Sequence, residues 1–194
     1  MLPLGLFRSR ALTAGTAVGL LFNLSLYGSL LCISLFLQQS RHESAAATGL
    51  LMLPMSVAVG AGSLASGRLT ARFGPRPPMI AGLALAAAGT ALLATAGTST
   101  PLALIVAGSL LIGLISLAMP AMTAAVVGAA GREHAGVASG ILNAARQSGG
   151  ALGVAVLGSL LGRGHTLSLH VPLLVATAGY LVAIALAWTT IRDR

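Results

Sequence analysis

Acidic residues, histidines and cysteines are scarce in this chain. The sequence has three acidic residues among 194, namely Glu43, Glu133 and Asp193, and a single cysteine, Cys32. One cysteine excludes an intramolecular disulfide. The four histidines, His42, His134, His165 and His170, have no metal-ligand spacing, and no nucleophile elbow, HExxH motif or phosphate-binding glycine loop is present. The sequence therefore predicts no catalytic residue, no metal site and no cofactor, and it disfavours an enzyme.

Charge in general is rare, and lysine is absent. Charged residues make up 7% of the chain and hydrophobic ones 56%, with a mean hydropathy of +0.95. A soluble domain has about 25% charged residues, so this composition excludes a water-soluble fold. The net charge of +8 comes from eleven arginines. Because nearly all of these arginines lie between long apolar runs and not along one polar face, they do not form a nucleic-acid-binding patch.

Long apolar runs are what the sequence does have. A bilayer core about 30 Å thick needs about 20 helical residues to cross it. Six runs are this long, and we expect an all-α membrane protein with the whole chain, residues 1–194, forming one domain in the lipid bilayer. The predicted spans are 11–37, 47–67, 79–97, 102–127, 136–161 and 171–191.

Arginine is distributed unevenly between the two ends of these spans. Short cytoplasmic loops collect positive charge. One side has eight arginines, and the other has two, Arg41 and Arg163; the eight are Arg8, Arg10, Arg68, Arg72, Arg76, Arg132, Arg192 and Arg194. The bias predicts a multi-pass protein of the cell membrane with both termini in the cytoplasm.

The predicted spans also divide into two units of three. Spans one to three and spans four to six would cross the membrane in opposite directions. Inverted repeats of this kind are common in secondary transporters, so the fold expected is a half bundle of two inverted three-helix repeats.

A short segment between the second and third spans resembles a known signature. Residues 67–76, GRLTARFGPR, resemble the loop motif of the major facilitator superfamily at Gly67, Arg72, Gly74 and Arg76. Glycines there permit a tight reversal, and arginines can bond the last carbonyls of a neighbouring helix. The resemblance implies a loop that controls conformation, but Ala71 stands where that family has an acid.

A longer resemblance covers the fifth predicted span. Residues 131–158, GREHAGVASGILNAARQSGGALGVAVLG, resemble the fourteen-helix drug:proton antiporters of the EmrB/QacA type, as do Pro3–Arg8 and Leu37–Gln39. Because a complete member has about twice as many helices, the resemblance is to the C-terminal half. It implies export of drugs or other small amphipathic compounds together with an N-terminal half or a second copy. The alternative is a non-transporting membrane subunit or a truncated structural fragment.

Polar residues inside the predicted spans are the candidates for a substrate cavity. Arg146 lies about ten residues into the fifth span, where an ionisable group is costly unless it faces protein or water. Asn143 and Gln147 share its helix face, and Asn23 and Tyr27 are one turn apart in the first span. The competing interpretations are a cavity lining, a structural arginine bonding neighbouring carbonyls, and an arginine that reaches to the membrane surface.

Prolines and small residues within the spans indicate packing or hinges. Gly149 and Gly153 are four residues apart, which favours close helix contact. Pro54 and Pro120 each remove an intrahelical hydrogen bond and can kink a helix. No span contains a carboxylate of the kind that proton-coupled carriers normally use, so proton coupling would require the missing half.

The arginine bias predicts a topology that can be tested. We expect reporter fusions after Pro75 and His134 to be cytoplasmic, and fusions after Ser99 and Gly164 to be external, because arginine is retained on the cytoplasmic side. Paired alkaline phosphatase and green fluorescent protein fusions measure this directly. The reversed pattern would overturn the orientation.

Overall fold

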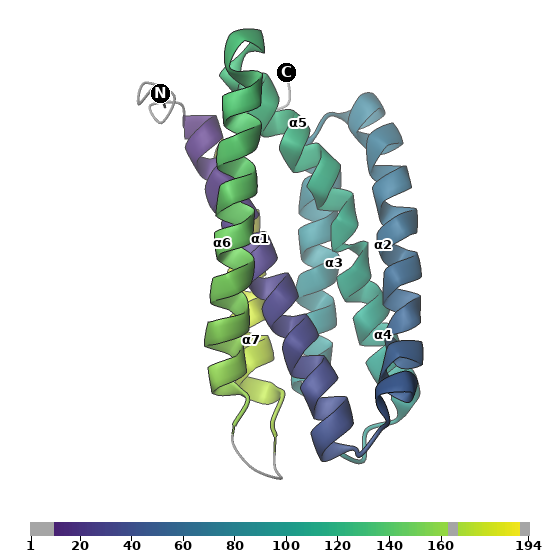
Figure 1. The fold of residues 1–194 in the computed structure, drawn as a ribbon. Coiled ribbons are helices and arrows are strands. Elements are labelled where there is room, and N and C mark those ends of the chain that lie inside the picture. Colours follow the sequence, from purple (N-terminus) through teal and green to yellow (C-terminus); the bar gives the residue numbers. More distant parts are fainter. Residues whose placement is uncertain (1–9, 163–166, 191–194) are drawn as a thin grey trace.

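The computed structural model describes residues 10–162 and 167–190, and the regular structure of these residues is helical (Figure 1). The long helical segments run up and down with short connections, so consecutive segments are antiparallel, while α4 and α5 continue in one direction (Figure 1). In chain order they are α1 (Arg10–Leu35), the π-helical turn η2 (Phe36–Ser40), α2 (Ala45–Phe73), α3 (Arg76–Ala94), α4 (Leu102–Gly113), the 3-10 turn η3 (Leu114–Leu117), α5 (Ala118–Ala130), the 3-10 turn η4 (Arg132–His134), α6 (Ala135–Leu160) and α7 (His170–Thr190).

Five helical segments within the described residues are long and apolar enough to cross a membrane. They are Leu12–Ser40, Ala45–Phe73, Arg76–Ala94, Leu102–Ala130 and His170–Thr190. The prediction named six, and α6 is not among the five. With 26 residues, α6 is about 39 Å long, so it has the length. Its glycines and its polar residues Asn143, Arg146 and Gln147 make it less apolar than the others.

The helix ends around the second and third spans differ from the predicted span ends by several residues. The second span was predicted to end at Gly67, but α2 continues to Phe73. Gly74 ends it with a φ of 81°, and its N–H donates to the carbonyl of Thr70 over 3.0 Å. A left-handed glycine is the usual helix terminator. The third helix then begins at Arg76, where prolines fit the first turn, and it ends at Ala94 instead of Gly97.

The fourth predicted span is interrupted in its middle. The α-helical pattern gives way to the tighter turn η3 at Leu114–Leu117, just before Pro120. Pro120 has no N–H to donate to the carbonyl of Ser116, four residues earlier, and its ring crowds that carbonyl. A tighter 3-10 turn is a common response to such strain. Helix α2, by contrast, continues through Pro54 without a break in its helical structure.

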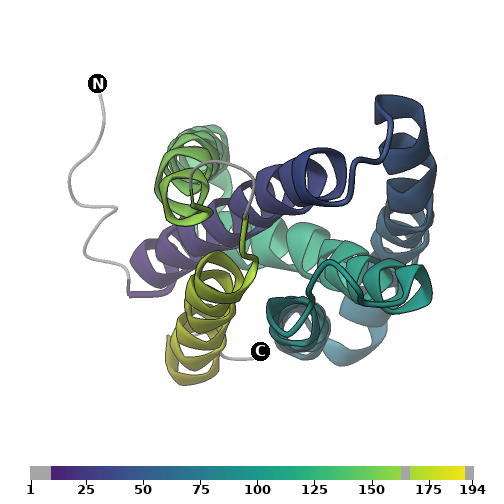
Figure 2. The ribbon, with the colours of Figure 1, turned by 90° about the horizontal axis from the view of Figure 1, so that it is seen from below.

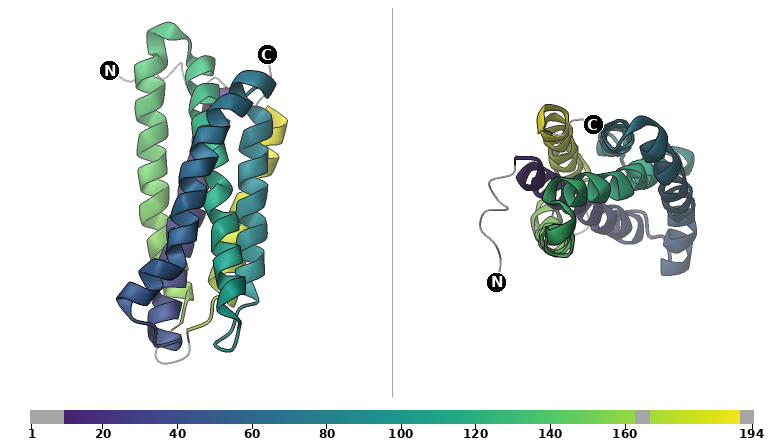
Figure 3. Two further views of the ribbon diagram at one scale, coloured as in Figure 1. Left: turned by 90° about the vertical axis from the view of Figure 1, so that its right-hand side faces the viewer. Right: turned by 90° about the horizontal axis from the view of Figure 1, so that it is seen from above.

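Helix α1 packs between α6 and α7. Seen from below, α6 and α7 lie on opposite sides of α1, α2 lies past the end of α1 that leads into it, and α3 packs beside α7 and α4 (Figure 2). We call the end that contains the α2–α3 turn the basic end, because Arg68, Arg72 and Arg76 lie there. Helix α1 begins and α7 ends at this same end (Figures 1 and 3), which agrees with the arginine pattern of the sequence.

Glycines allow α1 and α6 to pack with their backbones almost in contact. A methyl group on Gly149 or Gly153 of α6 would collide with the carbonyl of Leu20 or Leu24 of α1, and a methyl group on Gly28 would lie 2.7 Å from the carbonyl oxygen of Gly153. Without a hydrophobic driving force between helices in lipid, such close contact supplies much of the attraction. The sole cysteine, Cys32, is fully buried in this interface, where its thiol donates to the carbonyl of Leu157 over 3.4 Å.

We expect Gly149→Ala to destabilise the bundle, because its new methyl group meets backbone that cannot move aside. Overpacking of this kind costs about 1–3 kcal/mol. Gly140→Ala on the same helix is the matched control: no atom lies within 4 Å of its added methyl group, and replacing a helical glycine by alanine gains about 0.5–1 kcal/mol. The stability of both variants is measured as the temperature at which unfolding exposes the buried Cys32 to a fluorogenic maleimide. Equal melting temperatures for the two variants would contradict this packing.

Candidate functional site

A polar contact joins α1 and α6 in the middle of the apolar bundle. The side-chain amide of Asn23 on α1 donates to the main-chain carbonyl of Arg146 on α6, with nitrogen and oxygen 2.8 Å apart. Asn23 is only 2% exposed. The structure therefore places Asn23 between two helices and not on an open surface. The bond fixes the height of α6 relative to α1.

The side chain of Arg146 lies half-buried against neutral groups. Its aliphatic stem runs next to Gly19, where an added methyl group would lie 3.2 Å from Cγ. Its Nη2 is 3.4 Å from the sulfur of Met119, and its guanidinium carbon is 5.9 Å from the centre of the Phe22 ring. Sulfur and an aromatic ring are weak partners for a cation. No carboxylate compensates the charge, because none of the helices α1 to α7 contains an acidic residue.

Two polar atoms of this cluster have no hydrogen-bond partner among the described residues. They are Oδ1 of Asn23 and Nε of Arg146. A buried acceptor or donor without a partner costs about 1–3 kcal/mol, so native proteins retain few of them. Where they persist, a functional role or a bound group outside the structure is the usual reason.

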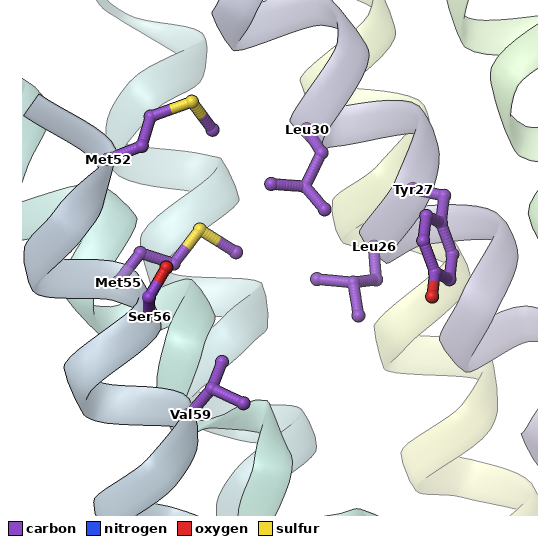
Figure 4. A pocket seen from close by; sticks show the side chains of 7 residues that line it. All are labelled: Leu26, Tyr27, Leu30, Met52, Met55, Ser56 and Val59. Carbon is purple, nitrogen blue, oxygen red and sulfur yellow. The ribbon is translucent and has the colours of Figure 1, made fainter. Parts of the chain in front are cut away.

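A pocket opens between α1 and α2, beside this cluster. It has a volume of about 180 Å³ and its walls are apolar except for Tyr27 and Ser56. Leu26 and Leu30 project from α1 toward α2, and the α2 side chains face them across the gap (Figure 4). The pocket is lined by Leu26, Tyr27, Leu30, Met52, Met55, Ser56 and Val59.

Tyr27 connects the pocket to α6. Its ring would lie 3.2 Å from a methyl group on Gly150, one helical turn after Arg146, and 46% of the residue is exposed. Asn143 and Gln147 are also exposed. Of the five candidates from the sequence, the structure thus brings Tyr27, Asn143, Arg146 and Gln147 to one side of α1 and α6, with Asn23 buried beneath them.

Sequence reasoning missed the pocket residues on α2 and the two neutral partners of Arg146. Met52, Met55, Ser56 and Val59 follow the i, i+3, i+4, i+7 spacing of a single helix face. That spacing was visible in the sequence. The partners Met119 and Phe22 come from distant parts of the chain, and no local pattern points to them.

The motif segment at the basic end is largely helical. Gly67 and Arg72 lie within α2 and not in a loop, so the tight reversal does not occur at Gly67, and a methyl group on Gly67 would meet no atom within 4 Å. The guanidinium carbon of Arg72 lies 5.2 Å from the centre of the adjacent Phe73 ring. Gly74 supplies the reversal of the chain described above.

Arg76 makes the long-range contact of this segment. Its Nη2 donates to the carbonyl of Trp188 over 2.9 Å, and its guanidinium carbon lies 4.3 Å from the centre of the Trp188 ring. Trp188 is in the last turn of α7, where carbonyls lack intrahelical partners and favour a cation. The α2–α3 turn is thereby tied to the end of α7.

No group of three or more histidine, cysteine or acidic side chains that would hold a metal ion occurs within residues 10–162 and 167–190. His170 begins α7, and its Nδ1 lies 3.2 Å from the carbonyl oxygen of Ala94. His165 and Arg163 lie outside the described residues, as do residues 1–9 and 191–194 with Arg8, Arg192, Asp193 and Arg194.

A helical bundle with five apolar segments of membrane-spanning length defines a multi-pass membrane protein. Its family follows from comparison with known proteins. The model of the Major Facilitator Superfamily matches residues 14–194, and the chain belongs to this family of membrane transporters.

Curated relatives are named for resistance and export. The chain is 37% identical to the methylenomycin A resistance protein of Streptomyces coelicolor, over 83% of this chain and 34% of that protein. It is 35% identical to the tetracenomycin C resistance and export protein of Streptomyces glaucescens and 38% identical to the multidrug resistance protein Stp of Mycobacterium tuberculosis, in each case over 83% of this chain and 30% of the relative. The chain thus spans about a third of the length of these relatives.

We expect Asn23→Leu to be at least as stable as the unchanged protein. Leucine has the same branching and the same number of side-chain heavy atoms, and it loses a hydrogen bond worth about 0.6 kcal/mol in a membrane protein. It also removes an unpaired buried acceptor that costs about 1–3 kcal/mol. The second effect is larger, so Cys32 should react with the maleimide at an equal or higher temperature. Asn143→Ala, an exposed amide on α6, is the control. If Asn23→Leu alone clearly lowered the temperature at which Cys32 reacts, Asn23 would be a residue that stabilises the bundle.

Proposed function

We propose that this chain forms the C-terminal six-helix half of an exporter of drugs or other small amphipathic compounds. The observation that supports this most directly is the grouping of an apolar pocket, Tyr27 and the half-buried Arg146 on one side of α1 and α6. Ligand sites are concave, mostly apolar and provided with a few convergent polar groups. The resistance and export proteins among the relatives suggest the kind of compound.

The proposal includes α6 as the sixth span, with both termini in the cytoplasm of a cell-membrane protein. Helix α6 is long enough, and it lies along α1, itself a candidate span (Figure 1). Its polar side chains would be tolerated where they face protein or a water-filled cavity. Two inverted units, α1 to α3 and α4 to α7, would then form the half bundle.

We further propose that transport requires a second bundle. Alternating access in such carriers is a rocking of one bundle against another. A second copy of this chain would provide a second bundle, but two copies would still have no acidic residue in their helices. Coupling to protons through a membrane carboxylate would therefore require a polypeptide that corresponds to an N-terminal half. In that assembly, the Arg76–Trp188 contact would hold the α2–α3 turn against the end of α7 and so influence the conformation of the basic end.

Reconstitution tests this requirement. We expect proteoliposomes with the chain alone to show no pH-driven uptake of a fluorescent drug, because no membrane carboxylate is available to take up the proton. Adding an N-terminal half, encoded upstream of Met1 or taken from a relative, should give uptake that a protonophore abolishes. Gly140→Ala is the variant expected to behave as the unchanged chain, and Gly149→Ala the one expected to lose uptake.

Two outcomes would count against the proposal. Protonophore-sensitive uptake by the chain alone would show that no N-terminal half is needed, and the histidines would then be the groups to test for proton coupling. No uptake with any N-terminal half would favour a non-transporting membrane subunit.

A further inference from the structure

The strongest unexplained feature of the bundle is a cation without a counter-charge. Arg146 lies midway along α6, and its nearest partners are a thioether and an aromatic ring. Glu133 precedes it by 13 residues, which corresponds to about 20 Å along a helix. Glu43 follows η2 at the end of the bundle away from the basic end. No carboxylate of the described residues is therefore placed to neutralise this guanidinium.

Tyr27 links the apolar pocket to the α6 segment that carries this cation. The Tyr27 ring lines the pocket and also lies against Gly150, four residues after Arg146, which is about 6 Å along the helix axis. A ligand with its ring system in the pocket would extend past Tyr27 to place an acidic group at Arg146.

The side chains next to Arg146 on α6 also favour an anion. The exposed amides of Asn143 and Gln147 flank Arg146 on α6, and their NH₂ groups can donate to a carboxylate. The pocket walls consist mostly of leucine, methionine and valine side chains. These neutral side chains bind an apolar ring equally well whether the compound that carries it is an anion or a cation. A cavity of about 150 Å³ holds benzene, so 180 Å³ accepts one aromatic ring or the edge of a larger ring system.

We propose that this site selects amphipathic anions: compounds with an apolar ring system in the α1–α2 pocket and a carboxylate or similar acidic group paired with Arg146. The inference rests on the proposed function, since it names the class of compound that the half bundle binds. It assigns charge selection to Arg146 and apolar affinity to the pocket. Amphipathic cations are disfavoured, because Arg146 repels them and no acidic side chain in the helices attracts them.

Three probes that differ only in charge test the proposal. They are 1-pyrenebutyrate, 1-pyrenebutanol and 1-pyrenebutylammonium, and they are titrated into the full chain in nanodiscs of zwitterionic lipid, with empty nanodiscs subtracted. We expect the acid to bind about tenfold more tightly than the ammonium compound, with the alcohol between them. This preference should weaken at high salt only slightly, because the site is partly buried.

Variants separate the two parts of the site. Arg146→Gln should bring the three dissociation constants within about twofold of one another, whereas Arg146→Lys should keep the order. Arg68→Gln removes an exposed arginine at the basic end and is the matched control for overall charge, so it should also keep the order. Val59→Trp should fill the pocket and weaken all three probes together. Maleimide reaction of Cys32 confirms that each variant is folded.

Several results would overturn the inference. They are equal binding of the three probes, tighter binding of the ammonium compound, no binding of any probe, or an order that persists in Arg146→Gln. A preference for the acid that disappears when an N-terminal half is added would show that a partner carboxylate pairs with Arg146 instead. Failure of the proposed function looks different: the charge order is present in nanodiscs, yet no gradient-driven uptake occurs with any partner half.

Discussion

The close packing of α1 on α6 is the contact on which the rest of the site depends. Gly149 and Gly153 let the two backbones meet at Leu20 and Leu24, and any larger residue would push the helices apart. Lipid chains are as apolar as the helices themselves, so burying leucine gives little net attraction, and shape has to supply it. A separation of even an ångström or two would break the Asn23 hydrogen bond and withdraw Arg146 from its neighbours.

This packing also explains how a cation is accommodated in an apolar bundle. Gly19 leaves room for the stem of Arg146, while Phe22 and Met119 cover part of the guanidinium. None of these groups cancels the charge. The bundle therefore holds an arginine half-buried and unneutralised, at an energetic cost that other contacts must offset. Such a residue is typical of a place where another charged group binds during function.

The two ends of the bundle are held differently from its centre. At the basic end, Arg76 bonds and stacks on Trp188 and ties the α2–α3 turn to α7. At the opposite end, Arg41 donates to the carbonyl of Thr100 over 2.5 Å and ties the start of α2 to the α3–α4 connection. From the η2 end, α1 and α2 diverge toward the basic end, and the pocket lies between them (Figure 1).

The sequence by itself determined the membrane class and five apolar segments of membrane-spanning length, because hydropathy is a property of each segment alone. It also indicated that glycines four residues apart would pack and that Pro120 would disturb its helix. Helix α2 continues past the predicted end of its span, since a helix in which Gly67 packs against nothing can continue to the left-handed Gly74. Only the tertiary structure decided that Asn23 is buried, that Met119 and Phe22 flank Arg146, and that Tyr27 joins the pocket to α6. Those relations depend on how helices distant in sequence rotate and approach one another, which backbone contact between α1 and α6 fixes and no local pattern encodes.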